Sequence, residues 1–188
     1  MNNLDLMLKR NKESASPMPS LPKSLQTLKA VIIGCADMRV DPAHVLGIKA
    51  GEAVVLRNIG GRVTPGLLEE FGLLGRIGEV AKTNPGDGGE FHLIVLHHTD
   101  CGSTRLAGDT AMLAHYFQIP ESEVAAKSVP DPRKSVAVDV AALRANPALP
   151  GAWLISGLVY DVGTGTCRGC RACSANTYRQ SGLIIGHA

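Results

Sequence analysis

Short apolar runs of strand length alternate along the chain with longer segments of helical periodicity. The first run, "LKAVIIGC", is apolar on both faces, which is typical of an interior strand of a parallel sheet. Four strands are predicted, at Leu28–Cys35, Glu52–Asn58, Phe91–His98 and Ala152–Val162. Helices are predicted between them, at about Pro65–Ala81, from Cys101 through Phe117, and from about Asp131 to just before Pro147.

Strands that alternate with helices indicate βαβ crossovers. We therefore expect an α/β fold with a mainly parallel central β-sheet flanked by helices. A proline-rich joint separates a short amphipathic arm (residues 1–27) from this α/β domain (residues 28–162), and the character of the sequence changes again in a cysteine-rich tail (residues 163–188).

The composition excludes several classes of partner. A chain of 188 residues with 45% apolar and 19% charged residues fits one globular domain. A net charge of +2 and only seven aromatic residues (three Phe, three Tyr and one Trp) do not favour nucleic acid or anionic lipid. No apolar run approaches the ~20 residues that span a bilayer.

The start of the chain lacks the apolar segment and cleavage site of a secretory signal, so we expect a cytoplasmic protein. It holds five cysteines. An odd number of cysteines without an export signal favours free thiols or metal ligands over a disulfide framework.

Candidate chemistry gathers where two predicted strands end. Cys35 closes the first strand, and "HHTDCG" places His98 and Cys101 at the end of the third. Reactive groups collect at the carboxyl ends of the strands in open α/β sheets. Two thiolates and one imidazole leave a fourth tetrahedral position open, which is the pattern of a catalytic zinc site, and these soft ligands favour zinc over magnesium or calcium.

Asp37 and Arg39 follow Cys35 at two-residue spacing. Two thiolates cancel the charge of zinc, so a bound hydroxide needs a nearby group to orient it, and Asp37 is placed to accept its hydrogen bond. Arg39 lies on the same side of an extended chain and can hold Asp37 off the metal in a fork-like pair.

Each feature alone has a simpler interpretation. A strand-end cysteine such as Cys35 is most often a small buried apolar residue. Asp37 and Arg39 alone would be a solvated surface pair worth under about 1 kcal/mol. The spacing of His98 and Cys101 could be an accident in a chain with six histidines. Their joint occurrence at two strand ends makes the metal site the favoured hypothesis.

The motifs "CADMR" and "HHTDCG", with "RNIGG" between them, resemble those of the β-class carbonic anhydrases over about Lys29 to Asp161. The resemblance implies a zinc enzyme that reversibly hydrates CO₂ to bicarbonate through a zinc-bound hydroxide. It implies Cys35, His98 and Cys101 as zinc ligands and Asp37–Arg39 as the catalytic dyad. It also implies a homodimer or larger homo-oligomer in which the N-terminal arm packs on the partner.

Two alternatives stay open on the sequence. Short relatives of this kind include carbonyl sulfide and carbon disulfide hydrolases, and none of the five site residues separates these activities. A non-catalytic zinc or thiol-redox protein, with Asp37 as fourth ligand, is the other alternative. The single Trp153 lies on the fourth predicted strand, so the tryptophan-containing bicarbonate-regulatory site of some relatives has no evident counterpart.

Two further features receive no firm role. The candidates for a proton shuttle, by pKa alone, are His44, His92, His97 and His115. The tail carries Cys167, Cys170 and Cys173 in a C-x-x-C-x-x-C pattern that the family does not supply. It indicates either a second metal site, completed by His187 or water, or a basic tail with exposed thiols.

Overall fold

The computed structural model describes residues 2–17, 29–80 and 90–169 of the chain. The strands are β1 (Ala30–Cys35), β2 (Val54–Asn58), β3 (His92–His98), β4 (Leu154–Asp161) and β5 (Thr166–Gly169). The α-helices are α1 (Asn3–Ser14), α2 (Pro42–Val45), α3 (Pro65–Val80), α4 (Thr110–Phe117) and α5 (Pro132–Arg144). Three 3₁₀ helices join them, η1 (Ile59–Gly61), η2 (Gly102–Leu106) and η3 (Glu121–Lys127).

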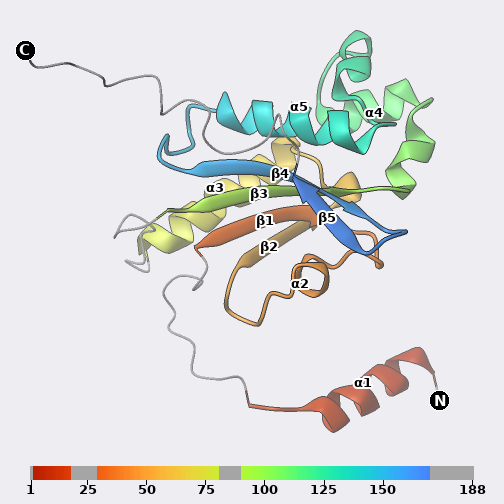
Figure 1. Cartoon of the computed structure of the whole chain (residues 1–188), viewed down its shortest axis with the longest axis vertical. Helices are drawn as coiled ribbons and strands as arrows, with labels where there is room; N and C mark the ends of the chain where they lie inside the picture. Colours follow the sequence, from red (N-terminus) through yellow and green to blue (C-terminus); the bar gives the residue numbers. More distant parts are fainter. Residues whose placement is uncertain (1, 18–28, 81–89, 170–188) are drawn as a thin grey trace, which may run out of the picture.

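The five strands form one sheet in the order β2-β1-β3-β4-β5 (Figure 1). The first four are parallel, with β1 paired to both β2 and β3, and β5 runs antiparallel to β4. The structure thus confirms the predicted α/β class with a mainly parallel sheet. Because β1 and β3 are neighbours, their carboxyl ends lie at the same edge of the sheet.

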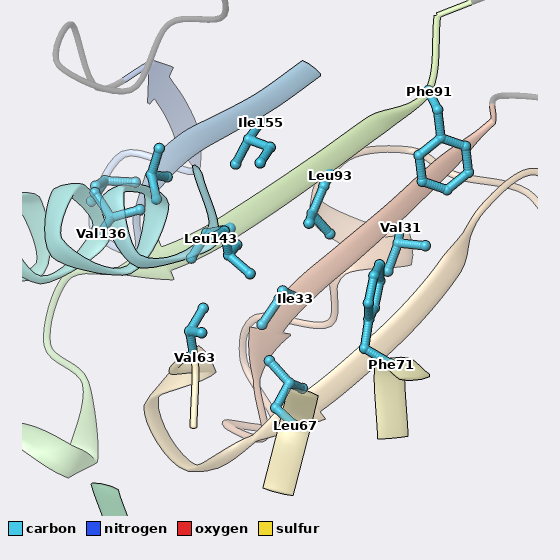
Figure 2. Packing of buried hydrophobic residues seen from close by; sticks show 13 residues of the cluster. Val31, Ile33, Val63, Leu67, Phe71, Phe91, Leu93, Val136, Leu143 and Ile155 are labelled. Carbon is cyan, nitrogen blue, oxygen red and sulfur yellow. The ribbon is translucent and has the colours of Figure 1, made fainter. Parts of the chain in front are cut away.

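The main core lies between one face of the sheet and helices α3 and α5. Alternate strand residues such as Val31, Ile33 and Leu93 point to this face and are at most 1% exposed (Figure 2). Leu67 and Phe71 of α3, and Val136, Val140 and Leu143 of α5, pack against them. Gly34 belongs to the opposite face, where the ring of Pro42 in α2 lies over it. The scaffold beneath the ends of β1 and β3 is therefore closely packed.

The four predicted strands are present, with ends shifted by one or two residues. The expected helix after Cys101 is instead η2 followed by α4. The reason is a new helix start at Asp109, whose side chain accepts a hydrogen bond from the backbone N–H of Met112 and caps α4. Neither η3 nor β5 follows from the sequence pattern, and β5 extends the sheet beyond Val162.

The N-terminal arm contains α1, whose start is stabilised by a reciprocal capping box between Asn2 and Asp5. None of its residues is buried, and Figure 1 shows it apart from the sheet. In the described ranges, every helix is too short or too polar to cross a bilayer.

Candidate metal centre

The ends of β1 and β3 bring together three side chains that can bind a metal ion. The sulfur atoms of Cys35 and Cys101 and a ring nitrogen of His98 all lie within 4.8 Å of one another, and the three side chains are buried. The two sulfur atoms are 3.8 Å apart. The parallel pairing of β1 and β3 explains this meeting, since residues 63 or more positions apart in sequence arrive at one sheet edge.

The His98 ring is oriented as a metal ligand. Its Nδ1 lies 2.9 Å from the carbonyl oxygen of Thr99, which can only accept, so Nδ1 carries the proton and Nε2 presents a lone pair. In the described part of the chain, Nε2 is the buried side-chain nitrogen or oxygen that lacks a hydrogen-bond partner. An unpartnered buried nitrogen is costly, and a cation beside it would satisfy it.

The two thiols differ in their surroundings. Cys35 Sγ lies 3.4 Å from the backbone N–H of Asp37, and Cys101 Sγ lies 3.1 Å from the hydroxyl of Ser103. Hydrogen bonding to the Cys101 sulfur, together with burial, raises the pKa of Cys35. The same hydrogen bond lowers the pKa of Cys101, and His98 and Ser103 contribute in that direction. Two sulfurs and one imidazole nitrogen form a donor set that fits zinc.

Asp37 and Arg39 form the predicted fork beside these ligands. Arg39 donates from Nε to Asp37 Oδ1 at 3.1 Å and from Nη2 to Oδ2 at 2.7 Å. These hydrogen bonds hold the pKa of the Asp37 carboxyl well below its usual range. Asp37 Oδ2 lies 4.0 Å from His98 Nε2, so the carboxylate faces the ligand cluster.

Asp100 is a second partner of Arg39 that the sequence reasoning missed. Arg39 Nη1 donates to Asp100 Oδ2 at 2.7 Å, and Nη2 donates to the Asp100 carbonyl oxygen at 2.8 Å. Asp100 has a left-handed φ of 52°, a conformation that aspartate tolerates better than most residues. Its place inside "HHTDCG" was the available signal. Arg39 therefore ties the loop after Cys35 to the loop that carries His98 and Cys101.

Arg57, at the end of β2, was also missed. It donates from Nε to the carbonyl oxygen of Cys35 at 2.8 Å and from Nη2 to the carbonyl oxygen of Asp37 at 2.7 Å. Its place at the start of "RNIGG" was the available signal. In the folded chain it fixes the backbone on both sides of Ala36, between the candidate ligand and the candidate catalytic carboxylate.

The other histidines differ in access to solvent. His97 is 2% exposed and both of its ring nitrogens have partners, Ser135 Oγ at 2.8 Å and the Gly61 carbonyl oxygen at 3.1 Å. His44 and His115 are exposed, and His92 is half-buried. In the tail, Cys167 lies on β5, whereas the proposed accessory ligands Cys170 and Cys173 lie outside the described residues.

Comparison with known proteins identifies the family of this site. Residues 30–167 match the sequence model described as carbonic anhydrase. β-Carbonic anhydrase 1 of Mycobacterium tuberculosis is 30% identical over 150 residues, which cover 79% of this chain and 83% of that protein. Carbon disulfide hydrolase of Saccharolobus solfataricus is 34% identical over 101 residues, covering 50% of this chain and 44% of that one.

Solved structures agree with the sequence comparisons. The crystal structure of carbonic anhydrase from Streptococcus mutans superposes with a TM-score of 0.63 at 29% identity, covering 91% of this chain and 99% of that chain. The shared fold, the family match over most of the length and the Cys-His-Cys cluster lead to one conclusion. The chain belongs to the β-class carbonic anhydrase family.

Proposed function

We propose that this protein catalyses the reversible hydration of CO₂ to bicarbonate and a proton, with zinc held by Cys35, His98 and Cys101. The observation that carries the proposal is the buried, unpartnered Nε2 of His98 beside two sulfur atoms at the ends of adjacent strands. Zinc held by these residues would lower the pKa of a bound water, as it does in carbonic anhydrases with three histidine ligands.

Asp37 is the proposed catalytic carboxylate. Arg39 keeps it ionised: its backbone N–H and Nε both donate to Oδ1, and its Nη2 donates to Oδ2. Oδ2 is therefore the oxygen that can accept one further hydrogen bond. That oxygen can orient the water that attacks CO₂, because it faces the ligand cluster. The fork also restrains Asp37 from turning into the metal site, and Asp100 restrains Arg39 in turn.

This restraint argues against the non-catalytic alternative, in which Asp37 closes the metal site. Within the described residues, the side chains close enough to share one ion are Cys35, His98 and Cys101, and Asp37 is not among them. A carboxylate engaged by both arms of a guanidinium would have to give up those hydrogen bonds to bind metal.

A proton must leave the site in each hydration cycle. His97 is a poor candidate for this transfer, since it is almost fully buried and both of its nitrogens are engaged. The side chains of His44 and His115 are exposed to solvent, so both remain candidates for this transfer. Replacing each by alanine and measuring hydration at low and high buffer concentration tests them, because external buffer rescues only a lost shuttle.

Hydrolysis of carbon disulfide or carbonyl sulfide is the second candidate function, favoured by the similarity to the Saccharolobus solfataricus hydrolase. That similarity covers half of this chain, whereas the mycobacterial carbonic anhydrase covers 79% of it. We therefore place CO₂ hydration first. Both reactions add water to a linear triatomic molecule, so the same residues would serve either substrate.

A paired assay on one zinc-quantified preparation separates the two functions. CO₂ hydration is followed by stopped-flow with a pH indicator, and sulfide release is followed with carbonyl sulfide and carbon disulfide. We expect rapid CO₂ hydration and little sulfide. Rapid sulfide release with slow hydration would reverse the assignment, and neither activity in zinc-loaded protein would leave a metal-binding protein without this catalysis.

We also propose that the chain assembles as a homodimer through its N-terminal arm. Helix α1 exposes Leu4, Met7 and Leu8 on one side, between 53% and 64% each, and buries none of its residues. Apolar side chains at this spacing form a stripe along a helix, and an isolated 12-residue helix is marginal in water. A second copy of the chain would cover this stripe.

A further inference from the structure

Four polar side chains are buried next to the metal centre and take no part in the proposed chemistry. Arg62, His97, Ser135 and Asp139 are between 0% and 4% exposed. Removing an ion pair from water costs free energy that hydrogen bonds must offset, and apolar residues of similar volume often serve stability as well or better. Stability alone therefore does not account for this cluster.

Asp139 is the centre of the cluster. Its Oδ2 accepts hydrogen bonds from Arg62 Nε at 2.7 Å and from the backbone N–H of Val63 at 3.2 Å. Its Oδ1 accepts from Arg62 Nη2 at 3.2 Å. Arg62 Nη2 also donates to the carbonyl oxygen of Lys127, and its guanidinium lies 4.9 Å from the ring centre of Phe117. Through Asp139, helix α5 therefore binds Arg62 and Val63, the two residues that follow η1.

His97, which Ser135 holds in turn, contacts the chain at Gly61, one residue before Arg62. His97 Nε2 lies near two acceptors, the Gly61 carbonyl oxygen at 3.1 Å and Asp139 Oδ2 at 3.4 Å, so it carries a proton. Its Nδ1 is then free to accept from the Ser135 hydroxyl at 2.8 Å. Side chains from β3 and α5 therefore fix Gly61 and Val63.

The other side of this turn packs against the backbone of Cys35 and against Ser103, whose hydroxyl contacts Cys101. Gly60 and Gly61 have left-handed φ values of 78° and 65°. A Cβ atom on Gly61 would lie 3.0 Å from the backbone nitrogen of Cys35, and one on Gly60 would lie 3.0 Å from Ser103 Oγ. Ser103 Oγ lies 3.1 Å from Cys101 Sγ. The turn therefore lies against both ligand-bearing segments.

We infer that Asp139 is a positioning residue for the metal site. With Arg62 and His97 it holds the Gly60–Gly61 turn, and the turn fixes the backbone of Cys35 and the hydroxyl that contacts Cys101. The cluster thereby sets the separation of the two sulfur atoms, which is 3.8 Å. This inference rests on the proposed function, in that Cys35 and Cys101 are taken to bind zinc.

The test replaces the ion pair without leaving a charge unpaired. The double variant Arg62→Met/Asp139→Leu substitutes apolar side chains of similar size, so the protein is expected to keep its melting temperature. Partners that support a metal ligand typically change metal affinity by about 10- to 100-fold when removed. We expect the zinc dissociation constant to rise within that range, and the thiolate-to-cobalt charge-transfer band of the Co²⁺-substituted protein to shift.

Val140→Ala is the matched control. Val140 is the neighbour of Asp139 on α5, is 1% exposed and packs in the main core. Its truncation should lower the melting temperature while leaving zinc affinity and the cobalt spectrum unchanged. A general loss of stability and a specific loss of ligand positioning are thus separated by measurements that do not depend on activity.

Ser135→Ala is a milder second variant, which removes the hydrogen-bond partner of His97 Nδ1. If the double variant does not fold, zinc affinity and the cobalt spectrum of Ser135→Ala test the inference. Weaker zinc binding with an altered cobalt spectrum supports the inference. Wild-type zinc affinity and an unchanged spectrum in the folded variants would overturn it. If the wild-type protein itself binds no zinc at this site, the proposed function fails, and that result is distinguishable from the failure of Asp139 as a positioning residue.

Discussion

Arg39 contacts both loops that carry the candidate zinc ligands. Its three nitrogens reach both carboxylate oxygens of Asp37 and two oxygens of Asp100. Hydrogen bonds to Asp37 and Asp100 raise the pKa of the arginine, so it stays charged at any pH of interest. The consequence is an Asp37 carboxylate that is ionised and fixed in direction.

Replacing Asp37 by asparagine tests this role. Asp37→Asn keeps the shape of the side chain but removes its charge and one acceptor oxygen. We expect zinc content to remain near that of the wild type and kcat for CO₂ hydration to fall by about 10²-fold or more. Stopped-flow hydration on zinc-quantified protein measures both quantities.

Asp41→Asn is a suitable control on the same loop. Asp41 caps α2, a role that asparagine fills equally well, and its carboxylate contacts Arg57 rather than the ligand cluster. Its kcat should stay close to the wild-type value. A kcat for Asp37→Asn within twofold of wild type would remove Asp37 from the mechanism.

At the scale of elements, the turn η1 is the part of the fold most sensitive to substitution near the site. Gly61→Ala would place a methyl group 2.9 Å from the carbonyl carbon of Gly34 in a left-handed conformation. Backbone strain of ~1–2 kcal/mol and crowding of ~1–3 kcal/mol predict a loss of about 2–5 kcal/mol of unfolding free energy.

Gly47→Ala isolates the conformational part of this loss. Gly47 has nearly the same φ, 66°, but a Cβ atom there meets nothing within 4 Å. We expect a loss of about 1 kcal/mol, from the left-handed conformation alone. Urea denaturation of the two variants gives the comparison, and equal losses would show that Gly61 is not packed against β1 as described.

The contact between helix α5 and the turn η1 should make the stability of the protein depend on pH, through the Asp139 carboxylate. Burial alone would raise the pKa of Asp139, but hydrogen bonds from His97 and Arg62 outweigh it and lower the pKa. An unfolded aspartate titrates near ~3.9, so the stability that Asp139 contributes is present above about pH 4 and is lost as the pH falls further.

The unfolding free energy should therefore fall more steeply between pH 5 and pH 3 in the wild type than in Arg62→Met/Asp139→Leu, by at most about 1.4 kcal/mol per pH unit. Asp37 and Asp100, whose pKa values are also lowered, titrate in both proteins and cancel in the comparison. Parallel curves from urea denaturation at each pH would contradict the coupling.

The strands, and the meeting of the candidate ligands Cys35, His98 and Cys101 at one sheet edge, could be predicted because they depend on local pattern. An apolar run that ends in Cys35, and another that ends in His98, place their last residues at one sheet edge once the strands are parallel. The roles of Asp100, Arg57 and Asp139 depend on contacts between distant elements. Asp100 and Arg57 lie inside the quoted motifs, but a motif does not say what their side chains contact, and Asp139 looks like an ordinary charged residue of a helix. The break before α4 was missed although Gly108 and Asp109 form a recognisable helix start.

For the molecule as a whole, α1 is notable because it buries none of its residues and lies apart from the sheet (Figure 1). Changing Leu4 and Leu8 to glutamate adds charge to its apolar stripe while keeping good helix-forming residues. We expect the double variant Leu4→Glu/Leu8→Glu to sediment as a monomer, or with a dimer dissociation constant raised at least about 10-fold, whereas Lys9→Glu on the same helix should not. Unchanged sedimentation of the double variant would exclude the arm from the interface.

A zinc titration followed by CO₂ hydration tests whether Cys35, His98 and Cys101 hold a catalytic zinc ion. Metal-free wild-type protein and Cys101→Ala would receive increasing zinc, with the rate of hydration and the bound metal measured at each addition. We expect wild-type activity to rise in proportion to zinc and to saturate at about one ion per chain, while Cys101→Ala stays inactive. Full zinc binding and full hydration by Cys101→Ala would contradict this expectation.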